Sequence, residues 1–99
     1  MVVKLFWEAQ AQQDREQIFH YFFEHAGLAL ADQVDAKFEE MAQLLQQNPQ
    51  LGKKVREVSS RYRKLIVPHF PFILIYVLEK ESLIILRVLH SARKLASNY

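Results

Sequence analysis

Apolar and polar residues alternate with two different periods, which divide the chain into a helical first half and an extended second half. Val2–Phe6 is β-branched and aromatic with one polar interruption, which is typical of a strand. In Glu8–Ala26 apolar residues recur at spacings of three, four and seven, and in Leu28–Gln47 at three and four, so both segments are predicted to be helices. Gly27 separates the helices, and Asn48-Pro49 ends the second, because the residue before a proline disfavours helical geometry.

The second half reads as three strong strands joined by two turns. Phe72–Leu78 is apolar at every position, which indicates a central strand with both faces buried. Tyr62–Val67 and Leu83–Leu89 are the strands before and after it. Pro68–Pro71 is too stiff for regular structure and Glu79–Ser82 is polar, so these two segments are expected to form the turns.

Together these elements predict an α+β domain over residues 1–99, in the order β-α-α-β-β-β. The helical hairpin is expected to cover one face of a mainly antiparallel four-stranded sheet, with Val2–Phe6 paired in parallel. Gln50–Ser60 is expected to be a short edge strand, which would be a fifth, or an extended loop. Ser91–Tyr99 is a basic, polar tail.

The composition is that of an ordinary soluble domain, with 51% apolar and 24% charged residues. The absence of cysteine excludes a disulfide framework and a thiolate metal site. No segment approaches the roughly 20 apolar residues that span a bilayer, and Met1–Trp7 lacks the pattern of a signal peptide. We therefore expect a cytoplasmic protein with no membrane partner.

The formal net charge of +2 conceals two halves of opposite sign. Residues 1–50 carry three cations against eight anions, a net charge of −5, and residues 51–99 carry ten cations against three anions, a net charge of +7. This asymmetry favours a polyanionic or acidic partner for the second half. The alternative is that the two halves neutralise each other within the fold.

Arg87 interrupts an otherwise apolar strand, where alternation would place it on the same face as Leu83, Ile85 and Leu89. An unpaired buried guanidinium is costly, so Arg87 must either pair or reach an open face. Its partner could be Glu57 or a carboxylate on a helix. A phosphate or an acidic residue of a partner protein is an equal alternative, because the planar guanidinium suits both.

His90 is the strongest candidate for acid–base chemistry, since its unperturbed pKa lies nearest neutrality. The alternative is a histidine that ends its strand and hydrogen-bonds locally to fix the tail. The other histidines have no metal-ligand spacing, so no metal site is predicted; they are His20, His25 and His69. The aromatic residues of the first helix are expected to be core; they are Phe19, Tyr21, Phe22 and Phe23.

Lys53, Lys54 and Arg56 form a short basic run. Such a run is usually a solvated edge that discourages strand pairing between molecules. It would become a binding surface if it shared a face with Arg63 and Arg93.

A set of short motifs spread over almost the whole chain resembles the RelE/ParE superfamily of bacterial toxins, from type II toxin–antitoxin modules. Their order and the size of the chain make the resemblance more specific than any one motif, and it is closer to ParE-like members. The motifs are Asp14, Ile18 and Tyr21; Gly27 and Ala31; Asn48-Pro49 with Gly52; Arg56-Glu57-Val58; Tyr62-Arg63; Phe70-Pro71-Phe72; Tyr76; and Ile85-Leu86-Arg87-Val88-Leu89-His90 with Arg93.

The resemblance implies one of two activities. Members that look like RelE are ribosome-dependent mRNA endoribonucleases, whereas ParE-like members poison DNA gyrase. The nuclease pattern has a tyrosine or phenylalanine near the end, where this chain has Arg93-Lys94-Leu95. This departure favours a ParE-like toxin that inhibits growth by binding, stabilises a plasmid, and is neutralised by an antitoxin. A third reading is a decayed toxin that only binds its antitoxin.

The resemblance also implies partners and site residues. A cognate antitoxin in a hetero-oligomer is expected, with gyrase as target, or the ribosome and mRNA in the alternative. DNA contact would come only through the antitoxin, and no cofactor is expected. In a nuclease His90 and Arg87 would be catalytic. The residues expected to bind the target or the antitoxin are Lys53, Lys54, Arg56, Arg63, Arg87 and Arg93.

Overall fold

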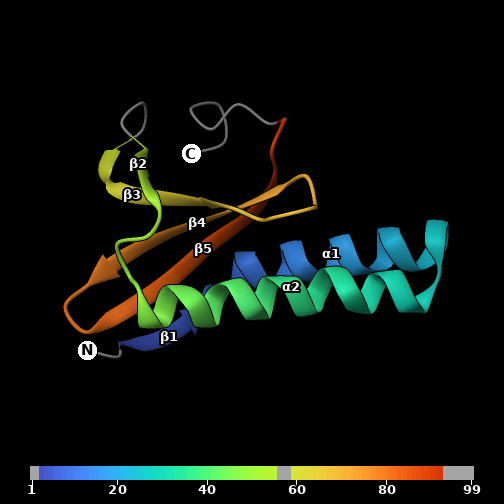
Figure 1. Ribbon diagram of the computed structural model, residues 1–99, viewed down its shortest axis with the longest axis horizontal. Helices are drawn as coiled ribbons and strands as arrows, with labels where there is room; N and C mark the ends of the chain where they lie inside the picture. The colour runs from blue at the N-terminus through green and yellow to red at the C-terminus, as the bar shows by residue number, and fades with distance from the viewer. Residues whose placement is uncertain (1–2, 56–58, 93–99) are drawn as a thin grey trace.

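The computed structural model describes residues 3–55 and 59–92 and has two helices packed on a five-stranded sheet (Figure 1). The predicted α+β class and the helical hairpin are therefore confirmed, and Gln50–Ser60 does contribute a fifth strand. The elements are β1 (Lys4–Trp7), α1 (Ala9–Ala26), α2 (Leu28–Gln47), β2 (Lys53–Val55), β3 (Ser59–Ile66), β4 (Phe72–Glu79) and β5 (Ser82–His90).

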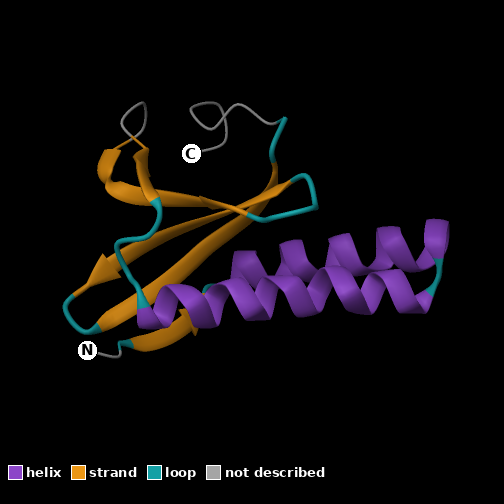
Figure 2. Cartoon of the chain, in the orientation of Figure 1, coloured by secondary structure: helices purple, strands orange, loops and turns teal. Residues whose placement is uncertain are grey.

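The strand order across the sheet is β1-β5-β4-β3-β2. β1 pairs in parallel with β5, as the two-helix crossover predicts, and the other pairs are antiparallel. The hairpin of α1 and α2 lies against one face of the sheet, and its far end extends past the strands (Figure 2). Among the described residues no helix is both long and apolar enough to cross a membrane.

Two apolar clusters lie on opposite faces of the central strand β4. Leu74 and Tyr76 belong to the cluster that includes Phe38 of α2, whereas Ile73 and Ile75 belong to a second cluster. Successive residues of a strand point to opposite faces, so the first cluster lies on the helix side and the second on the other side. The prediction of a doubly buried Phe72–Leu78 strand is thus confirmed, with every residue from 72 to 77 buried.

Gly27 joins the two helices directly. Its φ of 94° is a conformation that side chains rarely allow, and its N–H donates to the carbonyl of Phe23 at 3.1 Å. The predicted end of α2 is also confirmed, because Asn48 is its C-terminal cap and Pro49 follows.

The expectation that the aromatic residues of α1 are core was wrong for three of the four, because only Phe22 packs against a core cluster. Tyr21 is 58% exposed and Phe23 is 49% exposed, while Phe19 and Phe22 are half-buried. The reason is the position of this part of α1, near the end of the hairpin that extends past the strands (Figure 1). There α2 and the end of the sheet cover the helix only in part.

The expected face of Arg87 was confirmed with respect to Leu89 but wrong with respect to Leu83 and Ile85, because β5 contains a bulge. Ile85 lies opposite Tyr76, but Arg87 lies opposite Ile75, so Leu86 is an extra residue in β5. A bulge of one residue reverses the alternation that follows it. Val88 therefore continues the helix-side cluster, whereas Leu89 belongs to the opposite one.

Candidate functional site

Arg87 is bound to a carboxylate of α1, Asp14. Its Nε donates to Oδ2 at 2.8 Å and its Nη2 donates to Oδ1 at 3.1 Å, a bidentate pair. The side chains are 19% and 7% exposed, so the pair is largely shielded from water. Among the described residues, the structure thus confirms a helix carboxylate as a partner of Arg87, one of the alternatives that the sequence left open.

Asp14 also accepts a backbone hydrogen bond from β5, beyond the point where β1 ends and no longer pairs with that strand. β1 pairs with residues 82–85 of β5, and the N–H of Glu8 donates to the carbonyl of Ile85 at 2.8 Å. The chain then enters α1. Further along the same edge, the N–H of Val88 donates to Oδ2 of Asp14 at 2.9 Å. The carboxylate thus satisfies a backbone donor and a guanidinium together.

His90 ends β5 with an exposed ring. Its Nδ1 accepts a hydrogen bond from the N–H of Ala92 at 3.2 Å. This is the local hydrogen bond that the alternative to acid–base chemistry predicted for His90. The ring stands edge-on to Phe72, with centroids 5.7 Å apart. These contacts fix the imidazole against an aromatic surface.

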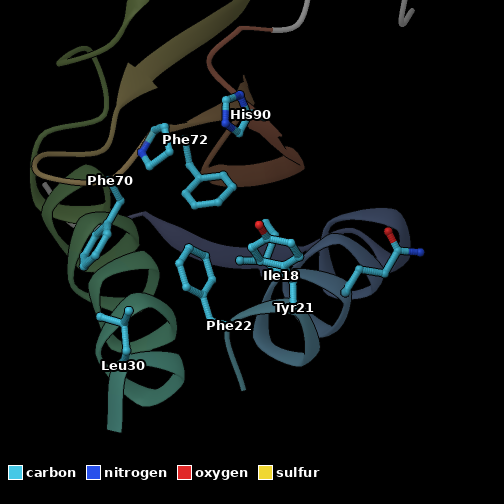
Figure 3. Close-up of a pocket in the computed structure, with 9 residues that line it drawn as sticks. Ile18, Tyr21, Phe22, Leu30, Phe70, Phe72 and His90 are labelled. Carbon is cyan, nitrogen blue, oxygen red and sulfur yellow. The ribbon is translucent and has the colours of Figure 1, made fainter. Parts of the chain in front are cut away.

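His90 and Phe72 also line an apolar hollow of about 590 Å³ (Figure 3). It lies between α1, the start of α2, the β3–β4 turn and the end of β5. The aromatic rings of Tyr21, Phe22, Phe70 and Phe72 surround the same space in Figure 3. The remaining lining residues are Gln17, Ile18, Leu30 and Pro71.

Sequence reasoning missed this cavity. Its only signal was the number of aromatic residues in α1 and in the segment Phe70-Pro71-Phe72, which were read as core or turn. Hollows of this size and polarity accept apolar groups, either of a small ligand or of a protein partner. Gln17, Tyr21 and His90 are the lining side chains with polar atoms that could orient a polar part of such a group.

The predicted basic residues of β2 and β3 do come together. Lys53 lies opposite Lys64, and Lys54 lies opposite Arg63. The two β2 lysines are exposed, whereas Arg63 is half-buried and its Nη1 donates to the carbonyl of Gly52 at 2.7 Å. Arg56 and Arg93, which were predicted to join this surface, lie outside the described residues.

Tyr76 holds the segment that leads into β2. Its hydroxyl accepts from the N–H of Gly52 at 2.8 Å and donates to the carbonyl of Pro49 at 2.9 Å. Burial raises the pKa of Tyr76 above its ordinary value, so the hydroxyl stays protonated over a wide pH range. A Cβ at Gly52 would lie 2.6 Å from this hydroxyl, which explains the glycine. The start of β2, and with it the position of Lys53, is therefore firmly fixed.

The fold has a clear counterpart among solved structures. It matches a chain of the "Chromosomal ParDE TA system from P. aeruginosa" with a TM-score of 0.80 and 21% identity, over 90% of this chain and 96% of that one. No match was found among curated proteins.

Residues 5–95 match the family model described as "ParE toxin of type II toxin-antitoxin system, parDE". The chain therefore belongs to the ParE toxin family, which confirms the resemblance drawn from its motifs. Membership of this family implies an antitoxin partner.

Proposed function

We propose that this protein inhibits bacterial growth by binding DNA gyrase and carries out no reaction of its own. Its cognate antitoxin neutralises it by covering it. The observation that carries this proposal is the bidentate pairing of Arg87 with Asp14. Because Arg87 is paired with Asp14, it does not offer its charge to an RNA phosphate, as an endoribonuclease acting through His90 would require.

Cleavage of RNA through the 2′-hydroxyl needs a base, an acid for the leaving oxygen, and cations that stabilise the developing charge on the phosphate. Nε and Nη2 of Arg87 both donate to Asp14. The carboxylate also cancels the positive charge that a phosphate would need. His90 stands against Phe72 beside an apolar hollow whose lining residues include no lysine or arginine, so this side of the ring offers a phosphate no cation.

Binding is supported by the surface of the molecule. An apolar cavity and exposed aromatic side chains, such as Tyr21 and Phe23, suit a protein partner. The acidic first half disfavours duplex DNA, so DNA contact would come through the antitoxin. Gyrase works in the cytoplasm, so this mode of action requires a cytoplasmic toxin. If the gene of the toxin were carried on a plasmid, the toxin would stabilise that plasmid.

Two assays on the purified toxin test the proposal. It is expected to block DNA supercoiling by gyrase in a dose-dependent way, and to leave mRNA intact on stalled ribosomes. The alternative, a ribosome-dependent endoribonuclease, predicts mRNA cuts that disappear in His90→Ala. Such cuts, with supercoiling unaffected, would refute the gyrase proposal.

A further inference from the structure

The edge of the sheet formed by β2 and β3 carries an arrangement that lowers the stability of the free protein. Two pairs of cations are directly opposed across these strands, Lys53 with Lys64 and Lys54 with Arg63. Like charges in directly opposed positions destabilise a strand pair. The arrangement therefore calls for an explanation other than the stability of the sheet.

These four cations have no countercharge in residues 3–55 and 59–92, where none of them forms an ion pair. The nearest described ion pair on β3 is that of Arg61 with Glu79, at 3.4 Å. Arg63 does donate to the carbonyls of Gly52 at 2.7 Å and Gln50 at 3.4 Å, but a neutral carbonyl leaves its charge uncompensated.

The two pairs lie on opposite faces of the sheet. Arg63 is opposite Tyr76, which belongs to the helix-side cluster, and Lys64 is opposite Ile75, which belongs to the other cluster. Opposed residues share a face. Lys54 therefore lies with Arg63 on the helix side, and Lys53 with Lys64 on the other.

β2 is the last strand of the described sheet and has a neighbour on one side only. The backbone of a nucleic acid would meet the cations of one face. An extended peptide added beside β2 would point alternate side chains to both faces, so acidic side chains in it would meet both pairs. The same lysines repel the β2 edge of a second copy.

We propose that the β2 edge binds an extended acidic segment of the antitoxin, which adds to the sheet as a further strand. Its carboxylates meet Lys53 and Lys64 on one face and Lys54 and Arg63 on the other. The anchoring of Gly52 by Tyr76 prepares the edge before the partner arrives. This inference rests on the proposed function for the identity of the partner, whereas the chemistry of the segment follows from the edge itself.

A synthetic peptide of about ten residues that alternates aspartate and valine tests the edge directly. Its affinity is measured by NMR titration at about 50 and 300 mM salt, with amide exchange across the sheet. The peptide is expected to bind more tightly at low salt and to slow amide exchange in Lys53–Val55. K53E/K54E is expected to weaken binding at least about tenfold, and K53Q/K54Q less.

The matched control is K4E, which reverses an exposed lysine on β1 at the opposite edge of the sheet and is expected to change affinity less than about twofold. Equal loss in K4E would overturn the proposal. So would a single-stranded DNA oligonucleotide that bound as tightly, or peptide binding without protection of β2. Because gyrase is absent from this assay, failure here with supercoiling still blocked would reject the edge alone.

Discussion

Asp14 receives three hydrogen bonds, two from the guanidinium of Arg87 and one from the backbone N–H of Val88. A buried carboxylate is stable only when its charge and its lone pairs are satisfied together. The short motif that includes Asp14 is therefore explained in this chain by structure, since it joins the first helix to the last strand.

Asp14→Asn is expected to lower the free energy of unfolding by about 3 kcal/mol, because it leaves the shielded guanidinium without a countercharge. Urea denaturation measures the change. Glu79→Gln is the control, since it breaks the exposed contact with Arg61 and is expected to cost less than about 1 kcal/mol. Equal losses in the two variants would contradict the role given to Asp14.

The buried hydroxyl of Tyr76 leads us to expect that the free energy of unfolding falls in alkaline solution. Burial raises its pKa above the ordinary value of 10.0, so the unfolded chain loses this proton first. The contribution is present below pH 10 and is lost as the pH rises through the folded pKa. Tyr76→Phe is expected to be less stable at neutral pH by about 1–2 kcal/mol and to show a shallower alkaline decline. Tyr21→Phe, an exposed control, should follow the parent curve, and a decline unchanged in Tyr76→Phe would disprove the assignment.

At this scale the sequence identified the residues but not their contacts. The cost of burying a charge predicted that Arg87 must either pair or reach an open face, and a local hydrogen bond was one of two predictions for His90, beside acid–base chemistry. The pairing with Asp14 depends on where α1 crosses the edge of β5, which no local pattern records, and Glu57, the other partner considered, lies outside the described residues. The role of Tyr76 was missed because its hydroxyl binds only backbone atoms of the loop at 49–52.

Among the elements, the helical hairpin combines a packed half with a half that extends past the sheet. Phe22 packs edge-on against Phe72 with ring centroids 6.2 Å apart, while the next residue, Phe23, is 49% exposed. One turn of helix thus contributes both to the core and to the surface.

Phe22→Ala is accordingly expected to cost about 2–3 kcal/mol, near the low end for a large aromatic residue because the site is half-buried. Phe23→Ala should change the free energy of unfolding by less than about 1 kcal/mol. Chemical denaturation of both variants compares two identical substitutions in adjacent positions. Similar losses would show that the end of the hairpin is packed after all.

The periodicity of apolar residues was enough to predict which helices and strands are present. Both helices lie within a few residues of their predicted bounds. The same holds for the strands predicted at Tyr62–Val67, Phe72–Leu78 and Leu83–Leu89. The bulge at Leu86 was not predictable in this way. It is a property of the pairing between β4 and β5, and it reverses the faces of all residues that follow it.

For the whole molecule, the opposite charges of the two halves are only partly neutralised within the fold. Arg15 of α1 pairs with Asp35 and Glu39 of α2, so these described ion pairs lie within the helical hairpin. The opposed cations of β2 and β3 have no such partners in residues 3–55 and 59–92. Family membership and the charge asymmetry were both available from the sequence, but the opposed register was not.

Lys53→Gln is therefore expected to stabilise the free protein by a few tenths of a kcal/mol at low salt, because it relieves repulsion with Lys64. The gain should shrink at high salt, where exposed charges are screened. Thermal unfolding in both conditions measures it, with Lys37→Gln as a control that breaks the contact with Glu40 and should not stabilise. A Lys53→Gln variant less stable than the parent would contradict this account.

The parallel pairing of β1 with β5 also constrains how the chain can be made. β1 and α1 find their partners in the last strand, through the register of Lys4 with Ser82 and the bond of Asp14 to Val88. A nascent chain on the ribosome cannot complete this sheet until β5 has been synthesised. Synthesis interrupted before β5 would release fragments that lack a closed core, so under the proposed function growth inhibition is expected only from chains that reach His90.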